Sequence, residues 1–287
     1  MVYLITGATG NVGSLVVAHL IKRGERPRIF VRDAEKAQAR FGNRVDILVG
    51  DLADTTTLSR ALAGVDALFL VNSGHDLAER DGVAAKAAVA ASVKHLVKLS
   101  SIDAREQNVG TGVWHAQGEA AIRASGISFT FVQPSGFMTN ALYWASSIKA
   151  EGIVRTCTGD GKIPFIHSDD IAEIAVRALT TRDYDGASLP ISGPEGLSYA
   201  EMTAKIAAVI GKPLVMQPIS DAEARQQQLA WAAPEPLVEA RLSIFRAIRE
   251  GRLAAPTDTV LRVLGRKPIT FDQWVRENAA AFRSLSG

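Results

Sequence analysis

Three glycines near the start of the chain stand at a spacing that suits phosphate binding. Gly7, Gly10 and Gly13 follow a short apolar run at residues 2–5 and precede a stretch of helical periodicity at 14–23. The first N–H groups of a helix, together with its dipole, favour a negative charge. The first glycine allows a tight turn, the second lets the backbone approach a pyrophosphate, and the third lets helix and strand pack closely. The pattern indicates a dinucleotide site, with a structural turn that holds no ligand as the alternative. The other residues of the turn expected at the cofactor are Thr9, Asn11 and Val12.

A basic residue closes the second expected strand, where the adenosine ribose of a dinucleotide would lie. Arg32 follows Gly13 by 19 positions. An acidic residue at this place binds the ribose 2′-hydroxyl of NAD, whereas an arginine accommodates the 2′-phosphate of NADP. Lys36, one helical turn further on, could add charge, while Asp33 could instead bind a hydroxyl. Arg32 as a plain solvated charge is the remaining alternative. The pattern favours NADP(H) over NAD(H).

Further candidate cofactor contacts follow later strands, because ligands of open parallel sheets bind beyond the carboxyl ends of the strands. Asp51 and Leu52 come after the third expected strand and could flank the adenine, whose exocyclic amine would donate to the carboxylate. Asn72 and Ser73 follow the fourth strand and would pass under the second ribose. The segment expected to line the nicotinamide, after the sixth strand, consists of Pro134, Ser135, Gly136 and Phe137.

Strand-like and helix-like segments alternate through the first half of the chain. This order predicts an α/β fold of the Rossmann type, a doubly wound parallel sheet with helices on both faces. The expected strands are 2–5, 28–31, 45–49, 67–71, 95–99 and 128–132. The expected helices between them are 14–23, 34–41, 56–63, 78–92 and 114–124.

The alternation loosens after residue 134, and the last third of the chain is mostly helical in pattern. We therefore expect a dinucleotide-binding core at 1–134, to which 163–182 returns. Residues 135–162 and 183–287 are expected to form a smaller, mostly helical cap that binds the substrate, with a cleft between cap and core.

Composition excludes several classes of protein. The 32 Lys and Arg nearly balance the 30 Asp and Glu, so no strong field for a polyanion such as nucleic acid is implied. A single cysteine, Cys157, excludes an intramolecular disulfide, and the scattered His19, His75 and His95 offer no metal-ligand spacing. No apolar run reaches the length of a membrane span, and a strand from residue 2 leaves no room for a signal peptide. These features predict a cytoplasmic protein with a small-molecule substrate; a homodimer stays open.

Several motifs occur in one order along the chain, and together they resemble a known family. The motifs are GATGNVG at 7–13, VRD at 31–33, GDL at 50–52, PSGF at 134–137 and HSDDIA at 167–172. The chain is similar in these motifs, and in its closing segment 257–282, to the NmrA-like branch of the atypical short-chain dehydrogenase/reductases. That group includes quinone oxidoreductases, triphenylmethane reductase and NADP-sensing regulators, so the resemblance implies NADP(H) binding.

The chain departs from ordinary short-chain dehydrogenases at the catalytic pair. Those enzymes use Tyr-x-x-x-Lys, in which the lysine lowers the pKa of the tyrosine. None of the four tyrosines here, Tyr3, Tyr143, Tyr184 and Tyr199, has a lysine four places on.

The helix expected at 114–124 carries His115 and Glu119 instead, and similar NmrA-like proteins place a histidine there. Residues four apart share a helix face, so these two side chains could hydrogen-bond, with the imidazole as proton donor to a reduced oxygen. The alternatives are a surface pair, or a histidine that only contacts the nicotinamide ribose or carboxamide.

Several apolar side chains after the sixth strand could form a pocket for an aromatic ligand, although aromatic residues on helices are more often plain core. The candidate substrate contacts are Phe137, Met138, Tyr143, Trp144 and Trp231. The function that we expect is an NADPH-dependent reductase that transfers a hydride to an apolar aromatic or quinone-like acceptor. Two alternatives remain: a non-catalytic NADP(H)-binding redox sensor, or a tailoring oxidoreductase in an aromatic biosynthetic pathway.

Overall fold

The structure is a computed structural model, and it describes residues 1–105 and 109–283. The chain divides into two compact units. Unit 1 comprises Met1–Gln107, Gly112–Pro134 and Ser168–Pro190, and unit 2 comprises Asn108–Thr111, Ser135–His167 and Ile191–Gly287. The segment that returns to unit 1 is thus longer and later than the expected 163–182, because it ends with the last strand of the sheet.

Unit 1 is built on a seven-stranded sheet with the strand order β3-β2-β1-β4-β5-β6-β9. Every pairing from β3 to β6 is parallel. The strands are β1 (Tyr3–Thr6), β2 (Arg28–Val31), β3 (Asp46–Val49), β4 (Ala67–Leu70), β5 (His95–Leu99), β6 (Phe129–Pro134) and β9 (Ser188–Ile191). The central strands β1, β4 and β5 are buried at every residue, as expected of a parallel sheet that is covered on both faces.

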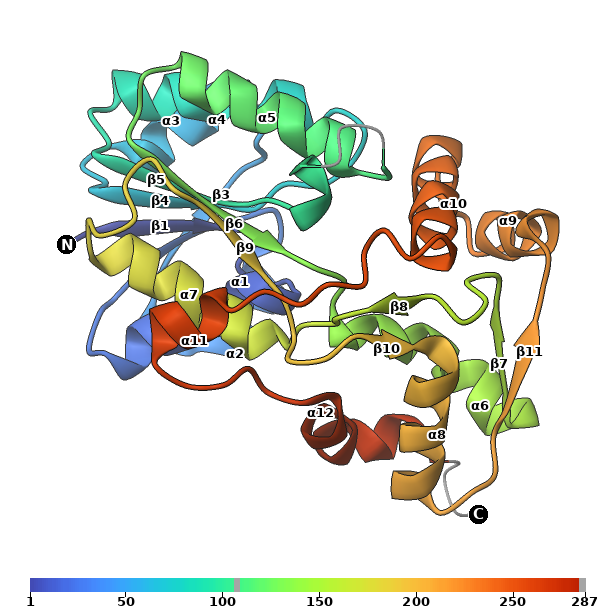
Figure 1. Cartoon of the computed structure of the whole chain (residues 1–287). Helices are drawn as coiled ribbons and strands as arrows, with labels where there is room; N and C mark the ends of the chain where they lie inside the picture. The colour runs from blue at the N-terminus through green and yellow to red at the C-terminus, as the bar shows by residue number, and fades with distance from the viewer. Residues whose placement is uncertain (106–108, 284–287) are drawn as a thin grey trace. The chain divides into compact units, whose positions relative to one another are not determined.

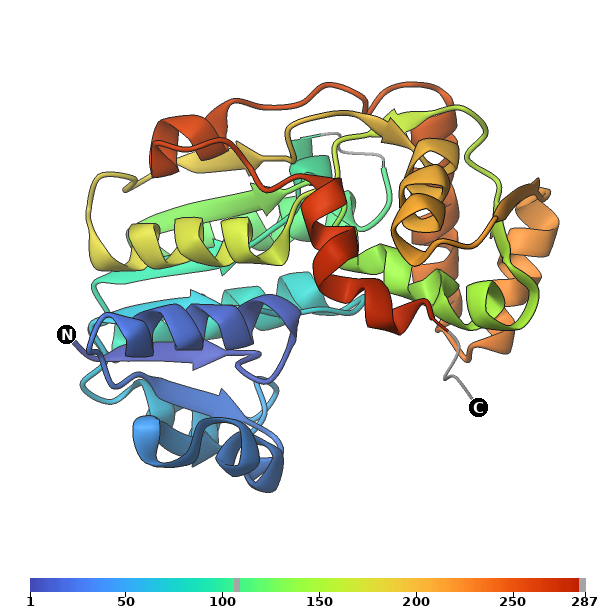
Figure 2. The ribbon, with the colours of Figure 1, turned by 90° about the horizontal axis from the view of Figure 1, so that it is seen from below.

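Helices cover the two faces of this sheet. Figure 1 shows α3 (Thr55–Leu62), α4 (Leu77–Ala90) and α5 (Gly112–Ala124) on one face. The other face carries α1 (Asn11–Lys22), α2 (Ala34–Phe41) and α7 (Ser168–Thr180), and Figure 2 views the same layers from below. Two short 3₁₀ turns, η1 (Gly42–Arg44) and η2 (Ile102–Arg105), complete the unit. The expected Rossmann-type fold is confirmed.

The apolar core of unit 1 lies between the sheet and the helices α3, α4 and α5. Leu4, Leu68 and Leu96 from three adjacent strands are fully buried there against Leu58 and Ala84 of the helices. Asp side chains begin two of the helices: Asp33 accepts from the backbone N–H of Lys36, and Asp54 accepts from those of Thr56 and Thr57. Hydrogen bonds to capping side chains therefore define where α2 and α3 begin, and core packing holds α3 and α4 on the sheet.

Unit 2 is mostly helical. Its helices are η3 (Met138–Trp144), α6 (Ala145–Glu151), α8 (Tyr199–Ile210), α9 (Asp221–Ala230), α10 (Glu235–Arg249), α11 (Thr259–Leu264), α12 (Phe271–Asn278) and η4 (Ala279–Ala281). Two strand pairs accompany them, β7 (Ile153–Thr156) with β11 (Val215–Pro218) and β8 (Lys162–Ile163) with β10 (Leu197–Ser198). Its core gathers large aromatic side chains, among which Trp274 stacks on Phe271 with ring centroids 5.4 Å apart. No helix in the described part of the chain could span a membrane.

Candidate functional site

The glycine turn that follows β1 has the geometry of a phosphate-binding turn. Gly7 has a φ of +59°, a conformation that glycine adopts without strain. A Cβ on Gly13 would lie 2.3 Å from the carbonyl oxygen of Gly7, so the helix α1 packs on the turn at a distance that no side chain permits. Gly10 is the N-cap of α1 and makes no side-chain cap hydrogen bond. The N-terminus of α1 therefore lacks the capping side chain that α2 and α3 have, which suits an anionic ligand.

An arginine that the sequence reasoning missed supports this turn. The guanidinium of Arg40, on α2, donates to the carbonyl oxygen of Thr9 at 3.2 Å and to the hydroxyl of Ser14 at 2.7 Å. These contacts tie α2 to the turn and to the first turn of α1. Arg40 lies eight positions after Arg32, and its sequence context resembles that of any exposed helical arginine. Only the fold brings it to the glycine turn.

Arg32 lies at the end of β2, exposed to solvent. Among the described residues, its guanidinium has no hydrogen bond and no ion pair. Asp33, the competing group in the sequence, instead caps α2, with its carboxylate 2.9 Å from the backbone nitrogen of Lys36. The arginine is therefore the uncommitted group at this strand end, while the carboxylate has a structural role.

The segment after β3 forms a turn, which a hydrogen bond to its own acidic side chain stabilises. The carboxylate of Asp51 accepts from the backbone N–H of Ala53 at 2.9 Å, and Leu52 packs partly against the core of unit 1. A Cβ on Gly50 would lie 2.4 Å from the ring of Phe30, so a side chain there would force that ring to move. The expected adenine contacts thus lie in a backbone turn with a fixed shape.

Asn72, after β4, is held by a buried ion pair that the sequence did not reveal. Its amide donates to the carbonyl oxygen of Leu77 at 3.2 Å and to Asp81 at 3.4 Å. Asp81 in turn accepts from Lys98 of β5 at 2.5 Å, and both of these side chains are fully buried. Burial raises the pKa of the Asp81 carboxyl, while Lys98 acts in the opposite direction. Ser73, beside Asn72, is exposed.

The expected hydrogen bond between His115 and Glu119 is not formed among the described residues. Glu119 is buried and accepts instead from the hydroxyl of Ser100 at 2.6 Å and from the amide of Gln133 at 2.7 Å. The spacing on α5 is as expected, but the carboxylate faces the sheet, where β6 and the residue after β5 provide donors. The pairing prediction was wrong for this reason.

His115 is left with a buried nitrogen that has no partner in the described part of the chain. Its Nδ1 is inaccessible to solvent and makes no hydrogen bond with the described residues. Burial holds the pKa of this imidazole well below its ordinary value, and the nearby Lys98 charge lowers it further. His115 is therefore neutral at pH 7, which removes the ordinary reason for a histidine to act as an acid.

The segment expected at the nicotinamide crosses from unit 1, which ends there at Pro134, into unit 2. In unit 2, the hydroxyl of Ser135 donates to the carbonyl oxygen of Pro164 at 2.5 Å. Gly136 packs on Phe165, whose ring a Cβ would approach to 2.9 Å, and Phe137 forms a parallel bridge with Ile166. Backbone and side-chain bonds therefore fix the shape of residues 135–137.

The five expected substrate contacts all belong to unit 2, and four of them fall into two groups. Met138 is buried in the core of this unit, and Trp144 packs against that core with its ring edge-on to Tyr199. Tyr143 and Trp231, by contrast, are both exposed and stack on each other with ring centroids 6.2 Å apart. Phe137 is half-buried. The structure thus brings two of the five together at a surface and uses two others in the core.

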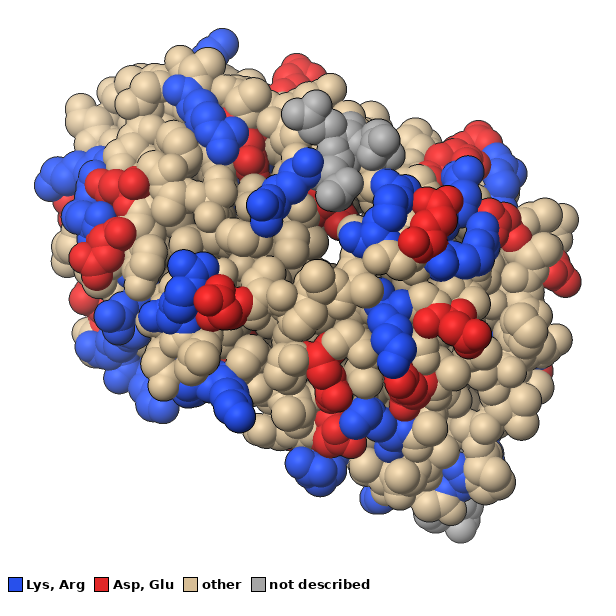
Figure 3. All heavy atoms as spheres, in the orientation of Figure 1, with Lys and Arg blue, Asp and Glu red and all other residues tan. Residues whose placement is uncertain are grey.

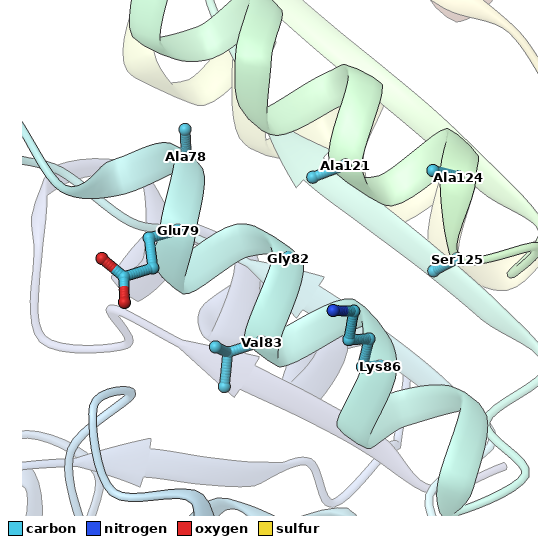
Figure 4. Close-up of a pocket in the computed structure, with 8 residues that line it drawn as sticks. All are labelled: Ala78, Glu79, Gly82, Val83, Lys86, Ala121, Ala124 and Ser125. Carbon is cyan, nitrogen blue, oxygen red and sulfur yellow. The ribbon is translucent and has the colours of Figure 1, made fainter.

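A shallow groove of about 400 Å³ lies between α4 and α5, and none of the expected site residues lines it. Figure 4 shows Gly82 of α4 facing Ala121 of α5. Glu79 and Lys86 lie at the sides of the groove. Among the described residues no group of three or more His, Cys, Asp or Glu side chains could hold a metal ion.

In unit 1 the first strand of a parallel sheet leads through a glycine turn into a helix that has no capping side chain. This arrangement defines a dinucleotide-binding Rossmann protein. Comparison with known proteins agrees: the model of a family described as NAD(P)H-binding matches residues 7–182. Two relatives cover 97% of this chain and are themselves covered over 98% of their length. One, 38% identical, is the (4-alkanoyl-5-oxo-2,5-dihydrofuran-3-yl)methyl phosphate reductase of Streptomyces griseus, and the other, 36% identical, is the NAD(P)H azoreductase of Xenophilus azovorans.

A solved structure of similar shape is the NADPH-dependent quinone oxidoreductase of Escherichia coli complexed with NADPH. It has a TM-score of 0.87 and 25% sequence identity, and the match covers 96% of this chain and 99% of that one. The chain belongs to the NAD(P)H-binding family. These matches confirm the expected NmrA-like resemblance and the expected class, an NAD(P)H-dependent oxidoreductase.

Proposed function

We propose that this protein is an NADPH-dependent reductase whose acceptor is an apolar aromatic or quinone-like molecule. The observation that carries the proposal is the uncapped N-terminus of α1 behind a glycine turn, with Arg32 uncommitted at the end of the neighbouring strand. The names of the relatives, a phosphate-ester reductase, an azoreductase and a quinone oxidoreductase, support reduction of a small conjugated acceptor. The proposed setting is the cytoplasm.

The residues of unit 1 fit such a cofactor. The backbone of Gly10 to Gly13 would receive the pyrophosphate at the start of α1, where a side chain on Gly13 would collide with the turn. Arg32 would bind the 2′-phosphate of the adenosine ribose, with Lys36 one turn further along α2 adding charge. NADP(H) is for this reason the proposed cofactor in preference to NAD(H).

The remaining cofactor contacts follow the other strand ends. Asp51 and Leu52 would flank the adenine, Asn72 and Ser73 would pass under the second ribose, and Pro134 to Phe137 would line the nicotinamide. Asn72 supports this assignment, since Leu77 and Asp81 hold its side chain. When bound, the nicotinamide supplies the hydride.

His115 is proposed to position the acceptor or the cofactor rather than to act as a strong acid. A neutral imidazole that has no hydrogen-bond partner among the described residues can donate or accept one hydrogen bond to a ligand through Nε2, since Nδ1 is closed to solvent. Its lowered pKa makes the protonated form scarce at pH 7, so the proton that completes reduction would come from solvent. Glu119 is proposed to act indirectly, since it holds Ser100 and Gln133 beside α5.

Loss of NADPH absorbance with a panel of quinones and aromatic aldehydes tests the proposal. We expect turnover by the wild type and a loss of about tenfold in His115→Ala with NADPH affinity unchanged. Gln117→Ala, an exposed change on the same helix, is the control. Tight NADPH binding without turnover of any acceptor would contradict the proposal and favour a redox sensor.

The pH dependence of kcat/KM separates the two roles of His115. A positioning imidazole that is already neutral predicts a flat profile over about pH 6 to 8. A general acid that titrates in that range would instead make kcat/KM fall as the pH rises through its pKa. Such a fall, absent in His115→Ala, would overturn the positioning role.

A further inference from the structure

The two exposed aromatic side chains of the described chain lie against each other. Tyr143 is 57% exposed and Trp231 is 51% exposed, and no other Phe, Tyr or Trp among the described residues ranks with the exposed large hydrophobic residues. They are 88 positions apart in sequence, yet their rings stack with planes only 15° apart. Exposed Leu142 and Leu229 neighbour them in sequence. An exposed apolar patch of this kind is often a binding surface.

A positive charge accompanies this aromatic pair. The guanidinium carbon of Arg241, on α10, lies 5.8 Å from the centroid of the Tyr143 ring. Arginine packs readily on an aromatic face and still presents its N–H groups to an anion at its edge. The three residues come from three different elements: Tyr143 from η3, Trp231 from the end of α9, and Arg241 from α10.

Arg241 differs from the other arginines of this region because it has no acidic partner among the residues that the structure describes. Arg225 pairs with Glu235 and Glu239, and Arg249 pairs with Asp221 at 2.8 Å. Arg246 lies 4.0 Å from Asp221, and Arg252 lies 3.0 Å from Glu250. Figure 3 shows basic and acidic side chains side by side over α9 and α10. Within the described residues, Arg241 makes no ion pair and keeps only the Tyr143 ring.

The local backbone holds the aromatic pair at the surface. Trp231 ends α9, and the next residue, Ala232, has a φ of +57°, which is uncommon for a residue with a side chain. This left-handed residue turns the chain sharply between α9 and α10. On α10, two residues beyond Arg241, the hydroxyl of Ser243 accepts from the backbone N–H of Gly110 at 2.6 Å. The positions of Trp231 and Arg241 are therefore each fixed by neighbouring backbone.

We propose that Tyr143, Trp231 and Arg241 form a subsite for an aromatic ring that bears an anionic oxygen group, such as a sulfonate or a carboxylate. The ring stacks on the Tyr143–Trp231 pair, and the guanidinium of Arg241 donates to the anion. This inference rests on the proposed function, because it assigns the subsite to the acceptor. The acceptor class becomes an aromatic compound with an acidic substituent.

Two matched probes test the subsite by direct binding. Naphthalene-2-sulfonate carries the anion, and naphthalene-2-sulfonamide has the same ring system without the charge. Calorimetry with the full chain saturated with NADP⁺ would measure both affinities. We expect the wild type to prefer the sulfonate by about tenfold, the range of a charge-assisted hydrogen bond, and to lose part of this preference at high salt.

Three variants separate charge from ring. Arg241→Ala should abolish the preference for the sulfonate, whereas Arg246→Ala, the control on another face of the same helix, should keep it. Trp231→Ala should weaken both probes by about fivefold, because stacking does not depend on the charge. All three positions are at least partly exposed, so the variants are expected to fold.

Several outcomes would overturn the subsite: no measurable binding of either probe, equal affinity for the two in the wild type, or an unchanged preference in Arg241→Ala. The proposed reductase is tested separately by turnover with uncharged quinones. Turnover without probe binding would overturn only the subsite. Binding with the expected preference, but no turnover of any acceptor, would overturn the reductase and leave a ligand subsite.

Discussion

The cofactor end of unit 1 and the aromatic face of unit 2 are built by different means. In unit 1 the backbone makes the site: glycine conformations, a helix N-terminus and strand ends fix it within short stretches of sequence. In unit 2 the candidate site consists of side chains from η3, α9 and α10, which only the tertiary fold brings together. The comparison teaches that a candidate site built from local backbone geometry can be predicted from one sequence, whereas a candidate site built from distant side chains cannot.

The buried ion pair beneath Asn72 gives the largest expected effect, because it supports the cofactor end from inside unit 1. Lys98→Met would leave the Asp81 carboxylate without its partner in a fully buried position. We expect a loss of about 3–5 kcal/mol in the free energy of unfolding, measured by denaturant titration. The double variant Asp81→Leu/Lys98→Met should be less destabilised than Lys98→Met alone. Equal losses in the two would contradict a buried charge pair.

Acid should weaken the interior of unit 1 through His95. Burial lowers the pKa of this imidazole to about 4, with Asp185 acting in the opposite direction and Arg182 in the same one. The unfolded chain therefore binds more protons here below about pH 6.5, so stability falls as the pH falls from there towards 4, by at most about 3 kcal/mol.

A buried group of unit 2, Tyr199, affects stability on the other side of neutral pH. Burial raises the pKa of Tyr199, so ionisation of that side chain costs stability only in alkali. Denaturant titrations at several pH values would measure the acid slope, and His95→Asn should flatten it. A slope unchanged in that variant would show that other groups cause the acid loss.

Gly13→Ala tests whether the backbone of the glycine turn forms the proposed phosphate site. The added methyl would meet the Gly7 carbonyl oxygen at 2.3 Å and force α1 away from the turn. We expect NADPH affinity to fall by more than about tenfold, as measured by calorimetry. Gly82→Ala, on α4 with its nearest neighbour 3.3 Å from the new Cβ, is the matched control and should bind NADPH as the wild type does. Normal NADPH binding by Gly13→Ala would contradict the assigned turn.

The sequence predicted the sheet and the glycine turn because each depends on local pattern, apolar runs in one case and glycine spacing in the other. It also placed Arg32 at the end of a strand, although the role of Arg32 toward a cofactor stays a prediction. It failed where a side chain chooses between neighbours on different elements. Glu119 has the spacing to reach His115 but bonds to Ser100 and Gln133, which lie 19 and 14 positions away. Met138 and Trp144 are as apolar as Tyr143, and only packing shows which of them enter the core.

The measurement that tests the central claim most directly is the ratio of kcat/KM for NADPH over NADH, with one quinone acceptor, in the wild type and in Arg32→Ala. The claim is that Arg32 reads the 2′-phosphate of a cofactor that the chain then oxidises. We predict a preference for NADPH of about tenfold or more in the wild type and a ratio near one in the variant, with NADH kinetics almost unchanged. Arg44→Ala, another arginine of unit 1, should keep the wild-type ratio. An equal loss for both cofactors in Arg32→Ala, or no turnover with either cofactor in the wild type, would contradict the account.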